Sequence, residues 1–235
     1  LTQDIDVLAT KHDALIVARE LHGTLAVAEL SDATPNTAIV TYVTPDGRKL
    51  FVDFMGTLIG LSNEEIRKTA VELDHPEYGL IRILHPTLVL KSRIVNLHRL
   101  AQKRHANGVE QARLAVPVVK AFLEYFVSSG LAGANPDKYL IDRIMRLHDL
   151  ALSDAGKFVY AEWGIDVMQA APMDRVQNQD FCAQHKPRME AECRQAGEIP
   201  ETAHPTEDKK AALSRFVRQH PVAKDLQSPL RLCDA

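Results

Sequence analysis

The chain has 235 residues, of which 46% are hydrophobic and 25% are charged, and its formal net charge at pH 7 is −3. These values are typical of a globular protein that buries a core, and they exclude disorder along the whole chain. We find no run of eighteen or more apolar residues and no basic-then-apolar leader, so we expect no membrane contact and a cytoplasmic protein. The three cysteines, all in the last quarter of the chain, predict reduced thiols rather than a disulfide framework.

The first stretch, residues 1–8, has the alternation of a β-strand. Successive side chains in a strand point to opposite faces, so Asp4 and Asp6 project from the same face. Two carboxylates this close raise each other's pKa unless a cation neutralises them, and hard divalent cations prefer such oxygen ligands. The stretch therefore predicts one side of a metal site.

The segments that follow predict one helix and several strands. Residues 10–22 have helical apolar spacing, which ends at Gly23. The other expected elements are a strand at 24–30, a loop at 31–37, and a β-hairpin whose arms, 38–43 and 49–54, flank the turn Pro45-Asp46-Gly47.

The second arm of this hairpin carries Asp53 between apolar residues. If this arm lies beside the first strand, Asp53 joins Asp4 and Asp6. We therefore expect a cluster of three carboxylates suited to one or two Mg²⁺ (or Mn²⁺) ions.

The second half of the chain predicts mostly helices. Ser62 and Glu65 have the spacing of a capping box, which would open a helix through about Leu73. Pro117 lies inside a later helical pattern and should kink or split it. The expected elements are a strand at 80–84, helices at 87–105, 108–126, 137–151 and 155–163, a linker at 131–136, and helical stretches near 175–183, 187–195 and 207–219.

Charge is divided unevenly along the chain. Residues 1–80 contain thirteen acids and six Lys or Arg, a net charge of −7, whereas residues 85–120 contain seven Lys or Arg and the single acid Glu110, a net charge of +6. The first segment would attract metal cations and the second phosphates, although a solvated helical face is the alternative for the second. Lys91, one turn into the helix after the sheet, is the residue that we expect nearest to a phosphate.

Two patterns together resemble a known family. Thr2-Gln3-Asp4-Ile5-Asp6, followed by a strand that ends Val52-Asp53-Phe54, resembles the active-site signature of the nucleotidyltransferase superfamily of the DNA polymerase beta type. The run from Ile83 to Arg93, with His85-Pro86 near its start, resembles the helical segment after the catalytic sheet in bacterial nucleotidyltransferase-like proteins. These include toxin-type members of abortive-infection and toxin–antitoxin systems. The resemblance covers residues 1–125.

The resemblance implies an enzyme that uses Mg²⁺ or Mn²⁺ to transfer a nucleoside monophosphate from a nucleoside triphosphate to a hydroxyl acceptor. Asp4, Asp6 and Asp53 would be the catalytic residues and the metal ligands, and Asp53 would accept the acceptor's proton. Lys91 and Arg113 would contact phosphates. An Arg-Asp pair of the toxin-like relatives appears here as Gln111-Ala112-Arg113, which puts a base on that helix in doubt. The acceptor could be a protein, a tRNA or a small molecule.

One departure from the family pattern leaves a second interpretation open. Family members carry a Gly-Gly or Gly-Ser turn before the Asp pair, and the chain begins too close to Asp4 to contain one. We expect that the sequence lacks the first part of a longer product. The alternative is a truncated, catalytically inactive copy of the nucleotidyltransferase fold that serves binding or regulation.

These observations predict an α+β fold in three parts. The parts are a small mixed-sheet nucleotidyltransferase core at residues 1–85, a helical domain at 86–171, and a peripheral helical extension at 172–235 that packs on the main body or on a second subunit in a homodimer.

Other motifs carry less weight. No serine-hydrolase elbow, P-loop or dinucleotide-binding glycine motif occurs in the chain. A nucleic-acid-binding module on the basic helices is disfavoured by the slightly acidic net charge. Cys182, His185 and Cys193 offer three zinc-type ligands, but their spacing matches no standard zinc site, so we expect ordinary surface residues.

Overall fold

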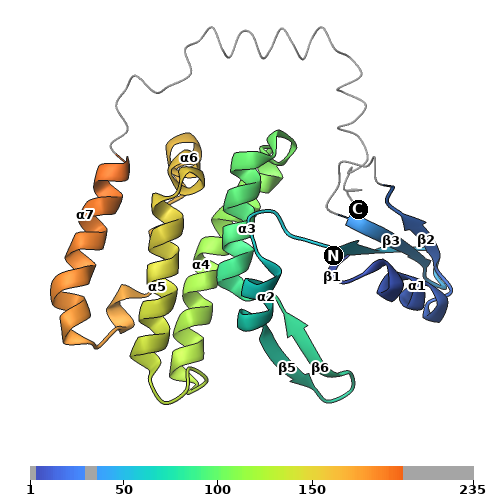
Figure 1. The fold of residues 1–235 in the computed structure, drawn as a ribbon, viewed down its shortest axis with the longest axis horizontal. Coiled ribbons are helices and arrows are strands. Elements are labelled where there is room, and N and C mark those ends of the chain that lie inside the picture. The colour runs from blue at the N-terminus through green and yellow to red at the C-terminus, as the bar shows by residue number, and fades with distance from the viewer. Residues whose placement is uncertain (1–3, 30–35, 198–235) are drawn as a thin grey trace, which may run out of the picture. The chain divides into compact units, whose positions relative to one another are not determined.

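The computed structural model describes residues 4–29 and 36–197 and shows an α+β protein, as predicted (Figure 1). The predicted helix at 207–219 and most of the predicted loop at 31–37 lie outside the described residues. The first elements are β1 (Asp4–Leu8), α1 (Lys11–Glu20), β2 (Thr24–Val27), β3 (Asn36–Val43) and β4 (Lys49–Met55). They are followed by α2 (Asn63–Thr69), β5 (Val71–His75), β6 (Gly79–Ile83), α3 (Pro86–Arg99), α4 (Ala106–Ser128), α5 (Pro136–Leu152), α6 (Asp154–Trp163) and α7 (Lys186–Gly197), with short 3-10 and π turns between some of them.

Four strands form a mixed sheet in the order β1-β4-β3-β2. β3 and β4 pair antiparallel, which confirms the predicted hairpin, and β1 pairs parallel with β4 on the other side. Because β1 is far from β4 in sequence, this parallel pairing brings the first strand of the chain beside the second arm of the hairpin.

Helix α1 covers one face of this sheet. It begins after Thr10, whose side chain and backbone N–H form a complete capping box with Asp13. Small residues let the helix approach the sheet closely, and Ala14 and Ala18 are buried against it. The buried residues of the sheet in this cluster are Ala38, Val40 and Phe54.

Residues 63–83 differ from the sequence-based expectation. The expected helix through about Leu73 is wrong, because α2 ends at Thr69 and Val71–His75 forms β5, paired antiparallel with β6. Leu73 fits a helical spacing but is 46% exposed, so it adds no buried face to a helix. The turn after β5 contains Pro76 and ends at Gly79, whose φ of +69° favours glycine. The turn residues therefore outweigh the helical spacing, and a hairpin forms.

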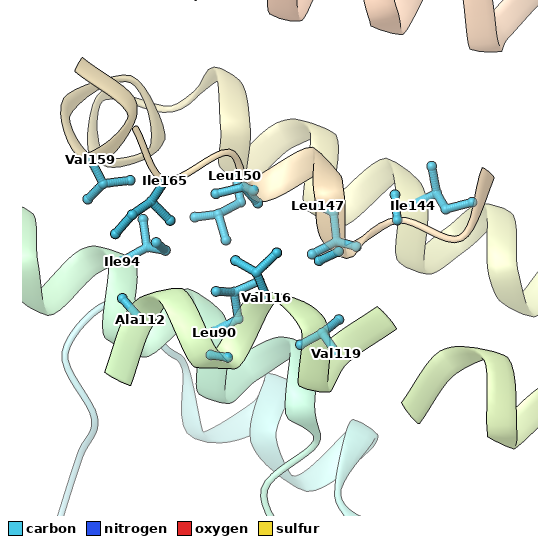
Figure 2. Packing of buried hydrophobic residues seen from close by; sticks show 14 of the residues in the cluster. Leu90, Ile94, Ala112, Val116, Val119, Ile144, Leu147, Leu150, Val159 and Ile165 are labelled. Atoms are coloured by element: carbon cyan, nitrogen blue, oxygen red, sulfur yellow. The ribbon is translucent and has the colours of Figure 1, made fainter. Parts of the chain in front are cut away.

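The helices from α3 onward share one hydrophobic core. Residues three or four apart on each helix form its buried stripe, as expected for amphipathic helices. Phe181 and Met189 are buried in the same core, so the described part of the predicted peripheral extension packs on the main body. Figure 2 shows Leu90 and Ile94 of α3, Ala112, Val116 and Val119 of α4, Ile144, Leu147 and Leu150 of α5, Val159 of α6, and Ile165 in this packing.

Helix α4 runs without a break from Ala106 to Ser128, although we expected Pro117 to kink or split it, and it is not split. Pro117 itself is exposed, whereas Val116 and Val119 beside it are buried. Burial on both sides of the proline keeps both halves helical despite the backbone N–H that proline lacks.

A small hydrophobic cluster joins the end of β1 to the start of α3. Leu61, Ile66 and Leu88 are buried in it, and Leu8, the last residue of β1, packs against them. Leu88 lies in the first turn of α3. This helix was predicted at 87–105; it begins at Pro86, one residue earlier, and ends at Arg99, where a short 3-10 turn follows. In the described ranges 4–29 and 36–197, no helix combines the length and the apolarity needed to cross a bilayer.

Candidate active site

The structure places Asp4, Asp6 and Asp53 on one face of the sheet. Asp6 stands opposite Asp53 in the register of the parallel strands β1 and β4. Asp4 precedes Asp6 by two residues and therefore points to the same face. Phe54, the neighbour of Asp53, points to the other face and is buried in the cluster with α1. The three carboxylates thus lie on the face of the sheet that α1 does not cover.

The surroundings of Asp53 disfavour its charged form. Asp4 and Asp6 are exposed, whereas Asp53 is half-buried. Burial raises the pKa of Asp53, the carboxylates of Asp6 and Asp4 raise it further, and a hydrogen bond with the Asn36 side chain opposes the shift. Asn36 is the first residue of β3, so the hairpin supplies both Asp53 and the polar group bonded to it. The affinity of Asp53 for a proton is therefore increased.

The chemistry of these residues suits a divalent cation. All three offer carboxylate oxygens, which are the ligands of Mg²⁺ in proteins. Their side chains do not converge, however: among residues 4–29 and 36–197, no three His, Cys, Asp or Glu side chains are grouped so that they could hold a metal ion. The three negative charges repel one another, which opposes convergence of the side chains. A bound divalent cation would attract all three carboxylates and offset this repulsion. The set therefore fits Mg²⁺ in ligand type, and its three carboxylates share one face of the sheet without being grouped around one point.

Lys91 has a carboxylate partner on α2 rather than on the sheet. Its Nζ lies 3.0 Å from each carboxylate oxygen of Glu65. The Ser62 hydroxyl accepts a hydrogen bond from the Glu65 backbone N–H, but the Glu65 carboxylate turns to Lys91, so only half of the predicted capping box forms. The predicted phosphate-binding lysine is thus held by a glutamate that sequence analysis had assigned to a helix cap.

Arg113 lies in another part of the helical region. Its Nη2 donates a hydrogen bond of 2.9 Å to the backbone carbonyl of Trp163, the last residue of α6. The last carbonyls of a helix have no partner within it, and a cation there also interacts favourably with the helix dipole. Arg113 therefore contributes to the end of α6. Among the described residues, no hydrogen bond or ion pair joins Lys91 or Arg113 to the three carboxylates on the sheet.

A groove beside α3 has no signal in the local sequence. A cavity of about 470 Å³ is lined by residues of α2, α3, α5 and α6. Within it, Arg146 Nη1 lies 3.9 Å from the Glu65 carboxylate that also binds Lys91. Its closer partner is Asp142, four residues earlier on α5, whose carboxylate lies 3.1 Å from Arg146 Nε. Helical spacing indicates that local pair, but no local pattern indicates the second partner on α2.

His85 is a buried polar residue that caps α3. The Thr87 backbone N–H donates to Nδ1 at 3.2 Å, so Nε2 carries the proton and donates to the Tyr139 hydroxyl at 3.1 Å. Burial, together with the charges of Arg143 and Arg146, lowers the pKa of His85 to about 4. His85 is therefore neutral at pH 7, and its role is in packing and capping.

The described cysteines behave as ordinary side chains. Cys182 Sγ donates to the Val176 carbonyl at 3.4 Å, and His185 stacks on Phe181. Burial raises the pKa of Cys193, and Asp166 and Glu192 add to the shift. A raised pKa keeps this thiol protonated, which is unfavourable for metal binding.

The candidate site is thus defined by Asp4, Asp6 and Asp53 on two parallel strands, with Lys91 and Arg113 engaged elsewhere. Comparison of the chain with protein-family models, with curated proteins and with solved structures gives no match.

Proposed function

We propose that this protein is a Mg²⁺-dependent nucleotidyltransferase that transfers a nucleoside monophosphate from a nucleoside triphosphate to a hydroxyl acceptor. The observation that carries the proposal is the register of β1 and β4, which sets Asp6 opposite Asp53 with Asp4 on the same face. The raised pKa of Asp53 beside two other carboxylates supports the proposal, because perturbed pKa values cluster at functional sites. The resemblance of these two acidic segments to the superfamily signature supports the same reaction.

Each carboxylate has a distinct role in this proposal. Asp4 and Asp6 are exposed and hold Mg²⁺ (or Mn²⁺) together with Asp53. When bound, the ion polarises the α-phosphate and offsets the charge of the triphosphate. Asp53 accepts the proton of the acceptor hydroxyl, because its raised pKa moves it towards neutral pH, where a general base is most effective.

Lys91 and Arg113 are the residues proposed to bind the phosphates. Both have other partners in this structure, which they must release first. Lys91 must leave Glu65, and Arg113 must leave the Trp163 carbonyl, before either can bind a triphosphate. The acceptor is a protein, a tRNA or a small molecule, and it is identified by which of these fractions of a cell extract receives the labelled nucleotide. A homodimer, which a toxin-type enzyme could form, belongs to the same proposal.

The contacts of Lys91 and Arg113 favour a second candidate, a nucleotidyltransferase-like protein that binds or regulates without catalysis. In that case both cations serve the fold, and the three carboxylates bind no nucleotide. Calorimetric titration with MgATP and with the other three nucleoside triphosphates separates the candidates, because the enzyme gives a heat of binding with at least one of them and the second candidate gives none.

The transferase is tested by following the transfer of an α-labelled nucleotide to acceptors in a cell extract in the presence of Mg²⁺. We expect Asp4→Asn and Asp53→Asn to lower the rate by at least about 100-fold, because each removes a charge from the reacting centre. Asp74→Asn is the matched control, since Asp74 is an exposed acid on β5, outside the site. Undiminished transfer in either site variant would overturn the proposal.

A further inference from the structure

The groove beside α3 has an apolar floor and a charged rim. Leu88 and Val95 of α3 and Leu147 and Leu150 of α5 line it and are buried. Its volume of about 470 Å³ lies within the range of small-molecule sites. A cavity with a few polar groups above an apolar floor holds the body of an organic ligand and orients it by its charged end.

The charges at one end of the groove are organised around Glu65. Its carboxylate, on a side chain that is 21% exposed, lies 3.0 Å from Lys91 Nζ and 3.9 Å from Arg146 Nη1. Lys91 comes from α3 and Arg146 from α5, so Glu65 of α2 bridges cations from two other helices. Arg146 also pairs with Asp142 of its own helix, whose carboxylate lies 3.1 Å from its Nε. One carboxylate on two converging cations is the arrangement in which a protein holds a ligand's carboxylate or phosphate.

We propose that this groove binds a small organic oxyanion, a phosphate monoester or a carboxylate. Its charged group would bind Lys91 in competition with Glu65, and Arg146 in competition with Glu65 and Asp142. The apolar body of the ligand lies on the floor formed by Leu88, Val95, Leu147 and Leu150. Glu65 is then a built-in competitor that sets the affinity of the site.

The rim of the groove argues for a ligand of low charge. Arg99 and Arg146 line it, but so do Asp149 and Asp154, and all four are exposed. With Lys91 and Glu65 included, three cations face three anions. A polynucleotide needs an excess of positive charge along its path and would meet repulsion here. A single oxyanion group needs only the Lys91 and Arg146 end.

This inference goes beyond the proposed nucleotidyl transfer and stands without it. None of Asp4, Asp6 and Asp53 lines the groove. Lys91 is the one residue that enters both proposals, and the groove gives it an oxyanion partner that requires neither the sheet nor Mg²⁺. Asp53→Asn, which removes the proposed transfer, should therefore leave oxyanion binding intact.

The test is calorimetric titration of the full chain with phenyl phosphate, with benzoate and with uncharged benzyl alcohol, in the absence of Mg²⁺. We expect an oxyanion to bind the wild type, and Glu65→Gln to tighten binding by about fivefold, because the variant removes a partly exposed ion pair. Lys91→Met should weaken binding by about tenfold or more, because it removes a charge-assisted hydrogen bond. Whichever of phenyl phosphate and benzoate binds more tightly shows which oxyanion the groove prefers.

Glu64→Gln is the matched control, since Glu64 is the neighbouring acid of α2 and forms an exposed ion pair with Lys68 outside the groove. It should bind as the wild type does. The proposal is overturned if neither oxyanion binds, if Glu65→Gln binds no more tightly than Glu64→Gln, or if benzyl alcohol binds as well as the oxyanions. Should Lys91→Met fail to fold, the exposed Arg146→Met replaces it, and unchanged affinity in that variant also overturns the proposal.

Discussion

Replacing Asp53 by asparagine should stabilise the protein at neutral pH while abolishing the proposed activity. Asparagine has the shape of aspartate without its charge, so Asp53→Asn relieves the repulsion between Asp53 and Asp6, which stand opposite each other. Its side-chain amide can still hydrogen-bond with Asn36. The change is therefore confined to charge.

The spacing of the strands sets the magnitude of this effect. Neighbouring strands lie about 4.8 Å apart, so two unit charges in opposite positions interact by about 0.9 kcal/mol in water and by about 3.5 kcal/mol at an effective dielectric constant of about 20. Asp6 is exposed and Asp53 is half-buried, so the lower value is closer. Like charges in opposite cross-strand positions destabilise sheets by up to about 1 kcal/mol. We expect Asp53→Asn to raise the free energy of unfolding by about 1 kcal/mol at pH 7.

The sign of the pH dependence follows from the direction of the pKa shift. Because the pKa of Asp53 is raised above its ordinary value of 3.8, the folded protein binds more protons than the unfolded chain between that value and the raised one. The contribution of Asp53 to the free energy of unfolding therefore falls as the pH rises through this interval, and the loss remains at higher pH. Near pH 3.5 the variant and the wild type should differ little.

Urea unfolding followed by far-ultraviolet circular dichroism at pH 3.5 and pH 7, with and without Mg²⁺, measures all of these effects. Mg²⁺ at ten times its Kd would stabilise the wild type by about 1.4 kcal/mol and the variant by much less. A variant less stable than the wild type at pH 7 would refute the electrostatic reasoning. Equal stabilisation of the two proteins by Mg²⁺ would remove Asp53 from the metal site.

Two further predictions concern the helical core. The pKa of His85 is lowered to about 4, so between that pH and 6.5 the unfolded chain binds more protons, and stability should fall by roughly 3 kcal/mol as the pH drops through this interval. His85→Asn keeps a capping acceptor and should lose that part of the dependence in urea unfolding at pH 7 and pH 4.5; an unchanged slope would contradict the assignment. Ile94→Ala should lower the free energy of unfolding by about 2–5 kcal/mol because Ile94 is fully buried in the core. Leu114→Ala, at a residue that is 57% exposed, should change it by less than about 0.5 kcal/mol, and equal losses in thermal unfolding would contradict the packing.

The sheet was predictable because its local signals agree. The turn Pro45-Asp46-Gly47 lies between two alternating segments, so turn chemistry and strand periodicity indicate the same hairpin, and β3 and β4 form it. The alternation around Asp4 and Asp6 likewise gave the face of β1. The parallel pairing of β1 with β4 has no local signal, and it was expected only because clustered carboxylates suggest a shared cation.

The errors occurred where local signals conflict. Ile66, Ala70 and Leu73 follow a helical spacing, but Pro76 and Gly79 mark a hairpin turn, and the turn decides the structure of Val71–His75. At Pro117 the conflict is resolved in the other direction, because burial along α4 outweighs the break that proline favours. A short helical spacing is therefore weak evidence for a helix where a defined turn follows it. A single proline is weak evidence for a helix break where a long buried stripe continues on both sides.

The ion pair between Lys91 and Glu65 could not be predicted from sequence, because a capping box already accounts for Glu65. Ser62 and Glu65 match a capping box, and that local reading leaves no reason to look for a second partner of Glu65. The tertiary structure brings α2 against α3, so the carboxylate of Glu65 binds Lys91 instead of the cap. Long charged side chains reach several helices, and their pairing depends on packing rather than on spacing.

The same packing relates the groove to the sheet carboxylates. Leu8 follows Asp6 by two residues on the same face of β1 and packs in the cluster with Ile66 and Leu88. Ile66 is the neighbour of Glu65, and Leu88 precedes Lys91 by one helical turn. The two sites are therefore linked through one small hydrophobic cluster and share no polar contact among the described residues. Because the cluster does not join the charges, removing the charge of Asp53 should lower transfer and leave oxyanion affinity unchanged. Removing the charge of Glu65 should raise oxyanion affinity, and because it frees Lys91 it should also favour the proposed binding of a triphosphate.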